Sequence, residues 1–65
     1  MTVGERIVSL RNELGLSQVE LAREAGLSRQ TLSSYENNIA DPKLFNAICI
    51  ADVLGVTLDY LAGRE

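Results

Sequence analysis

The chain has 65 residues, enough for one small core, because a chain this short buries only about 60% of the surface that its unfolded form exposes. One cysteine and no histidine exclude an internal disulfide and the usual cysteine and histidine metal sites. Nine acidic residues against six basic ones give a net charge of -3, the wrong sign for a chain that neutralises phosphates evenly over its surface.

The same composition argues against catalysis and against a membrane protein. No histidine, no thiol beside a basic partner and no glycine-rich phosphate loop are present, so we expect no enzyme, no cofactor and no small-molecule ligand. The apolar runs are far shorter than the roughly 20 residues that span a bilayer, and no apolar leader follows basic residues at the start. With a lone cysteine, this predicts a reducing, cytoplasmic location.

A first helix is predicted after Thr2, which can cap its start, and before Gly15, which suits a left-handed C-terminal position. Steps of four, three and four residues place its apolar side chains on one stripe: Val3, Ile7, Leu10 and Leu14.

A second helix is predicted to open at Ser17, because Glu20 three residues later completes a capping box, and to end at Gly26. Its inner face consists of Leu21, Ala22 and Ala25. Ser28 caps a third short helix, whose inner residues are Leu32 and Tyr35 and whose end is marked by Asn37 and Asn38.

The turn between these two helices holds only Gly26, Leu27 and Ser28, and a turn of this length with a glycine is typical of a helix-turn-helix. Ala22 is small enough for a close approach of the two helices, and Gly26 can adopt a positive φ. The sequence therefore predicts a helix-turn-helix over about residues 18–37.

A fourth helix is predicted to follow the loop Ile39–Asp41, with Pro42 in its first turn and Gly55 at its end. Its inward stripe is Leu44, Ala47, Ile48, Ala51 and Leu54. Thr57 then caps a last short helix that ends at Gly63, with Leu58 and Leu61 pointing inward.

Five helices with connections of two to five residues, and no strand pattern, predict a compact all-α fold. No linker, repeat or low-complexity segment divides the chain, so residues 1–65 are expected to form a single domain.

Several spaced groups of residues resemble the phage repressor and Cro family, the XRE-like helix-turn-helix regulators. They are Gly15-Leu16-Ser17-Gln18, Glu20-Leu21-Ala22, Gly26-Leu27-Ser28, Tyr35-Glu36 and Ile50-Ala51 with Leu54-Gly55-Val56. The resemblance covers about Ile7 to Leu61. It implies a lambda-repressor-like fold and a sequence-specific, DNA-binding transcriptional regulator, with repression as the expected action and the third helix in the major groove.

On this resemblance, the base contacts come from the third helix: Ser28, Arg29, Gln30, Ser33 and Ser34. Arg29 can donate two hydrogen bonds to guanine and Gln30 can make a bidentate contact with adenine, whereas the serines discriminate more weakly. Outside this motif, the same side chains would simply be solvated residues on a helix.

The resemblance assigns phosphate contacts to Gln18 and Asn37, with Lys43 as a third candidate, although each is also an ordinary surface residue. Asn37 can end its helix without DNA. An arginine and a glutamate pair structurally in such proteins, which here implies an ion pair between Arg11 and Glu36.

This chain departs from the family pattern in the loop after the third helix. Basic residues often touch the DNA backbone there, and Ile39, Ala40 and Asp41 stand in their place, while Asn38 replaces a glycine. We therefore expect fewer phosphate contacts and modest non-specific affinity.

Phe45 and Cys49 lie four residues apart, on the side of the fourth helix that faces away from its predicted stripe. Either they widen the core or they contact a second subunit, and Tyr60 has the same two interpretations. We expect a homodimer on DNA through the C-terminal half of the chain, which sets two recognition helices about 34 Å apart on a pseudo-palindromic operator.

Two other readings stay open. The acidic balance permits a helical protein-interaction module of the same fold with weak or no DNA binding. The chain could also be a DNA-binding domain of a longer regulator, with its dimer interface elsewhere.

Overall fold

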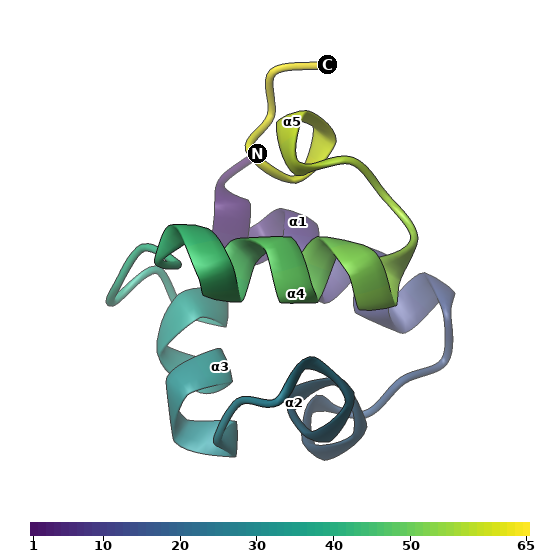
Figure 1. The fold of residues 1–65 in the computed structure, drawn as a ribbon, viewed down its shortest axis with the longest axis vertical. Coiled ribbons are helices and arrows are strands. Elements are labelled where there is room, and N and C mark those ends of the chain that lie inside the picture. The colour runs from purple at the N-terminus through teal and green to yellow at the C-terminus, as the bar shows by residue number, and fades with distance from the viewer.

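The computed structural model describes all residues 1–65 and contains five helices: α1 (Val3–Glu13), α2 (Gln18–Ala25), α3 (Arg29–Glu36), α4 (Leu44–Leu54) and α5 (Leu58–Leu61). The all-helical prediction is confirmed. Figure 1 shows α2 and α3 at the bottom of the molecule, α5 at the top and α4 across the front between them. None of the five helices has the length and apolar character needed to cross a bilayer.

Side-chain caps begin four of the five helices. Thr2 and Ser17 form complete capping boxes with Glu5 and Glu20, and Ser28 and Thr57 accept a backbone hydrogen bond at the starts of α3 and α5. Such caps satisfy backbone N–H groups that a helix start leaves free. The helix boundaries therefore follow from local sequence at these four sites.

Helix α4 starts differently from the prediction. Pro42 was expected in its first turn, but the helix begins at Leu44 and its N-cap is Lys43, which makes no side-chain capping bond. The connection before it spans residues 37–43 and exceeds the predicted two to five residues. Its first part closes onto α3, because the backbone N–H groups of Ile39 and Ala40 both donate to the carbonyl of Ser34.

The core contains one fully buried branched aliphatic residue from every helix: Ile7, Leu21, Leu32, Ile50 and Leu61. Burying a side chain of this kind stabilises the fold by about 1.5–3 kcal/mol relative to leaving it exposed. Smaller residues complete the core where helices approach closely, among them Ala22, Ala25 and Ala51.

Three inward assignments were wrong. Leu14 lies beyond the end of α1 and is exposed, and on α4 Leu44 is 67% exposed and Ile48 also lies at the surface. The buried side of α4 is formed by Ala51 and Leu54, as predicted, together with Ile50, which was not in the predicted stripe. Apolar residues surround most of this helix, so periodicity alone could not select the side that faces the core.

Helix α1 packs closely against the end of α3 at Gly4. A Cβ at this position would lie 2.5 Å from the carbonyl oxygens of both Tyr35 and Glu36. The Gly4 N–H donates to Oδ1 of Asn38 at 3.1 Å, and Nδ2 of Asn38 donates to the Thr2 hydroxyl at 3.0 Å. The start of α1 is thereby fixed to the turn after α3.

Candidate nucleic-acid interface

Helices α2 and α3 form the predicted helix-turn-helix pair. Gly26 adopts a left-handed conformation with φ 75°, and the Leu27 N–H donates to the carbonyl of Ala22 at 2.8 Å. A residue with a Cβ would be strained at this φ. The turn therefore sets α3 across α2 and leaves the N-terminal turn of α3 open to solvent.

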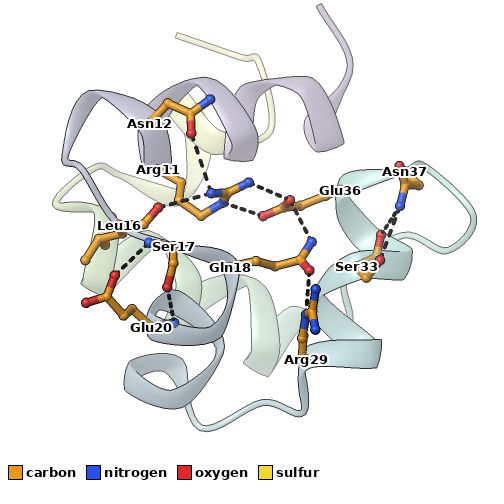
Figure 2. A network of polar contacts seen from close by, with 10 residues as sticks. All are labelled: Arg11, Asn12, Leu16, Ser17, Gln18, Glu20, Arg29, Ser33, Glu36 and Asn37. Carbon is orange, nitrogen blue, oxygen red and sulfur yellow. Dashed lines mark hydrogen bonds and ion pairs between the residues drawn. The ribbon is translucent and has the colours of Figure 1, made fainter.

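An ion pair behind this unit joins α1 to α3. Nε and Nη2 of Arg11 donate to Oε2 and Oε1 of Glu36 at 2.9 and 3.1 Å, and the two side chains are only 15% and 4% exposed. Nη1 of Arg11 also donates to the carbonyl of Leu16 at 3.0 Å. Figure 2 shows this bidentate arrangement, which fixes both planar groups.

The ion pair continues towards the surface through Gln18. Nε2 of Gln18 donates to Oε1 of Glu36 at 3.0 Å, and its Oε1 accepts from Nε of Arg29 at 3.1 Å. The four side chains form one connected network from α1 to the first residue of α3 (Figure 2). The Arg11–Glu36 part of the network is the ion pair expected from the family resemblance. The two bonds of Gln18 that extend it were not predicted, because residues 18, 29 and 36 have no spacing that indicates their contact.

The five predicted base-contact residues differ in solvent exposure and in the hydrogen bonds that they make within the protein. Arg29 and Gln30 are exposed at the start of α3. Ser28 is also exposed, but its hydroxyl accepts from the Thr31 N–H and donates to the Thr31 hydroxyl. Arg29 and Gln30 are thus the long polar side chains on this surface.

The other two serines are half-buried, whereas exposed positions were expected. The Ser34 hydroxyl donates to the carbonyl of Thr31 at 2.8 Å, which turns it back onto its own helix. Nδ2 of Asn37 donates one hydrogen bond to the Ser33 carbonyl and one to the Ser33 hydroxyl.

The predicted phosphate-contact residues lie at three separate places around α3. Gln18 opens α2, Asn37 ends α3, and Lys43 precedes α4. Asn37 and Lys43 are exposed, while Gln18 is half-buried and bonded at both ends of its amide.

Helix α3 carries no excess of acidic residues, although the whole chain does. Its only basic residue is Arg29, and its only acidic residue, Glu36, is buried and paired with Arg11. At the start of α2, hydrogen bonds from the backbone and then the side chain of Ser17 lower the pKa of Glu20. Glu20 points back to this cap and belongs to the helix start (Figure 2).

The predicted dimer-contact residues do not form one exposed set. Phe45 is 73% exposed and Tyr60 is exposed on α5, where the Arg6 guanidinium lies 5.9 Å from the ring centroid. For Cys49 the structure favours the first of the two interpretations, a wider core, because this side chain is half-buried and packs against the core. Leu44 and Ile48, predicted to face inward, instead lie beside Phe45 on the exposed side of α4.

Residues 7–61 match a protein-family model described as helix-turn-helix. The chain is similar to the immunity repressor protein of Bacillus phage phi105, with 40% identity over 100% of this chain and 45% of that protein. It is 33% identical to the cryptic phage CTXphi transcriptional repressor RstR of Vibrio cholerae, over 98% of this chain and 57% of the relative. The chain spans about half the length of these curated relatives.

Two solved structures that resemble this fold contain DNA. The P22 c2 repressor in complex with a synthetic operator has a TM-score of 0.94 and 28% identity, over 100% of this chain and 98% of that one. The biofilm regulator SinR in complex with DNA has a TM-score of 0.88 and 36% identity, over 92% and 97% of the two chains. The resemblance thus includes the whole five-helix arrangement.

Proposed function

Because the chain belongs to a helix-turn-helix family, we propose that it binds double-stranded DNA sequence-specifically and regulates transcription, with repression as its action. The observation that carries this proposal is the exposed N-terminal turn of α3, where Arg29 and Gln30 stand on a helix fixed by the ion pair behind it. The phage repressor and SinR complexes support the proposal. It involves no catalytic step, cofactor or small-molecule ligand, and it places the protein in the cytoplasm.

In this proposal α3 enters the major groove. Arg29 reads guanine and Gln30 reads adenine, while Ser28, Ser33 and Ser34 make shorter or water-mediated contacts. Asn37 and Lys43 contact phosphates on either side of the helix, and the loop residues Ile39–Asp41 add no positive charge. Affinity should then depend on a few base contacts more than on general attraction to DNA.

The proposal also includes pairing of two copies on a pseudo-palindromic operator, since one recognition helix reads only a few base pairs. Phe45 and Tyr60 stay the candidate contacts, and Leu44 and Ile48 extend the apolar surface around Phe45. Sedimentation equilibrium with and without operator DNA tests this part. A chain that remains monomeric and binds DNA one subunit at a time would contradict it.

Selection of duplexes from a random DNA pool at stated salt tests the central proposal. The wild type should enrich one palindromic sequence, and Arg29→Ala should weaken binding to it by about 1–3 kcal/mol in a titration of the labelled duplex. Arg64→Ala is the charge-matched control, because Arg64 is exposed and lies after α5.

The competing function is a protein-interaction module of the same fold. The exposed apolar side of α4, together with the net charge of -3, favours it. Such a module should enrich no sequence, and its weak DNA binding should respond equally to Arg29→Ala and Arg64→Ala.

A further inference from the structure

The two serines in the second turn of α3 differ in the hydrogen bonds that they make within the helix. Ser33 and Ser34 follow Arg29 and Gln30 by four residues each, so they lie on the same face of α3 as those two side chains. Both serines are half-buried, and a hydroxyl group has only one proton to donate. The bond that each hydroxyl makes inside the protein therefore decides what it can still offer to another molecule.

Ser34 uses its single proton inside the protein. Its hydroxyl lies 2.8 Å from the carbonyl oxygen of Thr31, and a carbonyl can only accept. The lone pairs of the Ser34 oxygen are what remains for a contact outside the helix. Toward another molecule, Ser34 is thus an acceptor.

Ser33 has the opposite arrangement, and Asn37 imposes it. Nδ2 of Asn37 donates to the Ser33 carbonyl at 3.0 Å, whereas a reversed amide would place its oxygen against that carbonyl. The carbonyl therefore fixes the amino group of Asn37 toward Ser33, where it also donates to the hydroxyl oxygen at 3.3 Å. An amino group of this kind cannot accept, so Ser33 keeps its proton for an acceptor outside the helix.

These two polarities correspond to the two kinds of group that distinguish bases in the major groove. Guanine and thymine present a keto oxygen, which accepts, whereas adenine and cytosine present an amino group, which donates. A hydroxyl that is restricted to one role pairs with one kind of group and opposes the other.

We propose that Ser33 and Ser34 are specificity-determining residues of opposite polarity: Ser33 contacts a keto base, Ser34 contacts an amino base, and Asn37 orients the Ser33 hydroxyl. The assignment rests on the proposed function and deepens it by naming the chemical group that each serine reads. It also gives Asn37 a role that differs from its expected phosphate contact. A phosphate contact raises affinity for every sequence, whereas this role affects one base pair.

Asn37→Asp should reverse one of the two polarities. The carboxylate is similar in shape to the amide but only accepts, so the Ser33 hydroxyl donates to it and becomes an acceptor toward DNA. The probes are the duplex selected by the wild type and the same duplex with a transition, which exchanges a keto for an amino base, at the pair whose preference disappears in Ser33→Ala. The wild type should prefer the keto duplex by about 2- to 12-fold, the net contribution of one hydrogen bond, and Asn37→Asp should prefer the amino duplex.

Three comparisons separate this reversal from a change in overall affinity. Asn38→Asp places the same charge on the next residue, whose side chain bonds to the start of α1, and should weaken binding to both duplexes while the keto preference remains. At the pair identified by Ser34→Ala, the wild type should prefer the amino base, and Asn37→Asp should leave that preference unchanged. In the Ser33→Ala background, Asn37→Asp should no longer alter the ratio of the two dissociation constants.

Two results would overturn the proposal while DNA binding stays sequence-specific. One is an equal loss of affinity for both duplexes in Asn37→Asp, which is the behaviour of a phosphate contact. The other is a wild type without a keto preference at the Ser33 pair or without an amino preference at the Ser34 pair.

A measurement on the free wild type keeps the test independent of how the variants fold. The side-chain amide protons of Asn37 should exchange with solvent more slowly than those of Asn12, whose amino group makes no hydrogen bond within the protein. Equal exchange would overturn the orientation of the Ser33 hydroxyl by Asn37. A wild type that selects no duplex would instead contradict the proposed function and this inference with it.

Discussion

Helices α1, α2 and α3 are joined to one another by directional polar contacts, whereas α4 and α5 attach to them almost entirely through apolar packing. The first group contains the Arg11–Glu36 pair, the two bonds of Gln18 and the two bonds of Asn38 to α1 and its cap. Across to α4, the side-chain bond is that of Asn46 Nδ2 to the Tyr35 hydroxyl at 2.9 Å.

The difference separates two tasks within one small core. Apolar burial supplies much of the stability, but it is non-directional and tolerates small rotations of one helix on another. Buried hydrogen-bonded networks instead favour one arrangement of the groups that they join. The helix proposed to read DNA is held by the second kind of contact, and helices α4 and α5 complete the core behind it.

Among the variants that test this difference, Arg11→Met is expected to change stability the most. It leaves the Glu36 carboxylate, only 4% exposed, without its ionic partner, which should lower the free energy of unfolding by roughly 3–5 kcal/mol. Urea denaturation followed by circular dichroism measures the loss. Arg64→Met, at an exposed position, should stay within about 0.5 kcal/mol of the wild type. A loss below about 1 kcal/mol for Arg11→Met would mean that apolar packing also holds the first three helices.

Lys43→Ser tests the second region, the helices attached by apolar packing, because α4 lacks a side-chain cap. Lys43 has the extended backbone of an N-cap, with φ -65° and ψ 154°, so a serine there should raise the free energy of unfolding by about 0.5–1 kcal/mol. The same change removes a proposed phosphate contact and should reduce the salt slope of DNA binding by about 0.9.

Lys43→Ala is the matched control, because it removes the charge without adding a cap. It should reproduce the change in salt slope and give no gain in stability. If serine and alanine give the same unfolding free energy, the start of α4 is not limited by its missing cap.

The smallest effect is expected for Glu20→Gln and concerns pH. Hydrogen bonds from the backbone and then the side chain of Ser17 lower the pKa of Glu20 below 4.5, so its charged form stabilises the folded state above that pH. This stabilisation is lost as pH falls through the lowered pKa. Glutamine keeps the capping geometry, so thermal unfolding of the variant should depend less on pH in the acid range. Parallel profiles of variant and wild type below about pH 5 would contradict this linkage.

Local sequence signals predicted most of the fold. Capping by Ser17, Ser28 and Thr57 marks three helix starts, and the left-handed glycines Gly26 and Gly55 mark two helix ends, in sequence and in structure alike. These signals depend on residues within one turn of each other, and so they can be read from the chain.

The errors occur where tertiary contacts decide. Leu44 and Ile48 lie on a helix that is apolar on nearly every side, so only its neighbours could determine which side is buried. The Gln18 network likewise joins three helices, and no local sequence pattern predicts it. The candidate base-contact residues Arg29 and Gln30 could be predicted from their position on α3. The hydrogen bond that joins Arg29 to Gln18 could not be predicted in this way.

The Arg11–Glu36 pair has a consequence for the rate of unfolding. Its partners are 25 residues apart, and closing a segment of that length costs conformational entropy that α2 and α3, joined by a short turn, do not incur between themselves. We expect the pair to form only after α1 docks on α3, and therefore late in folding. Contacts made late contribute little to the folding rate and mainly slow unfolding. The pair should thus set how long a single molecule stays folded, and in Arg11→Met the change should fall on the unfolding limb of a stopped-flow chevron plot.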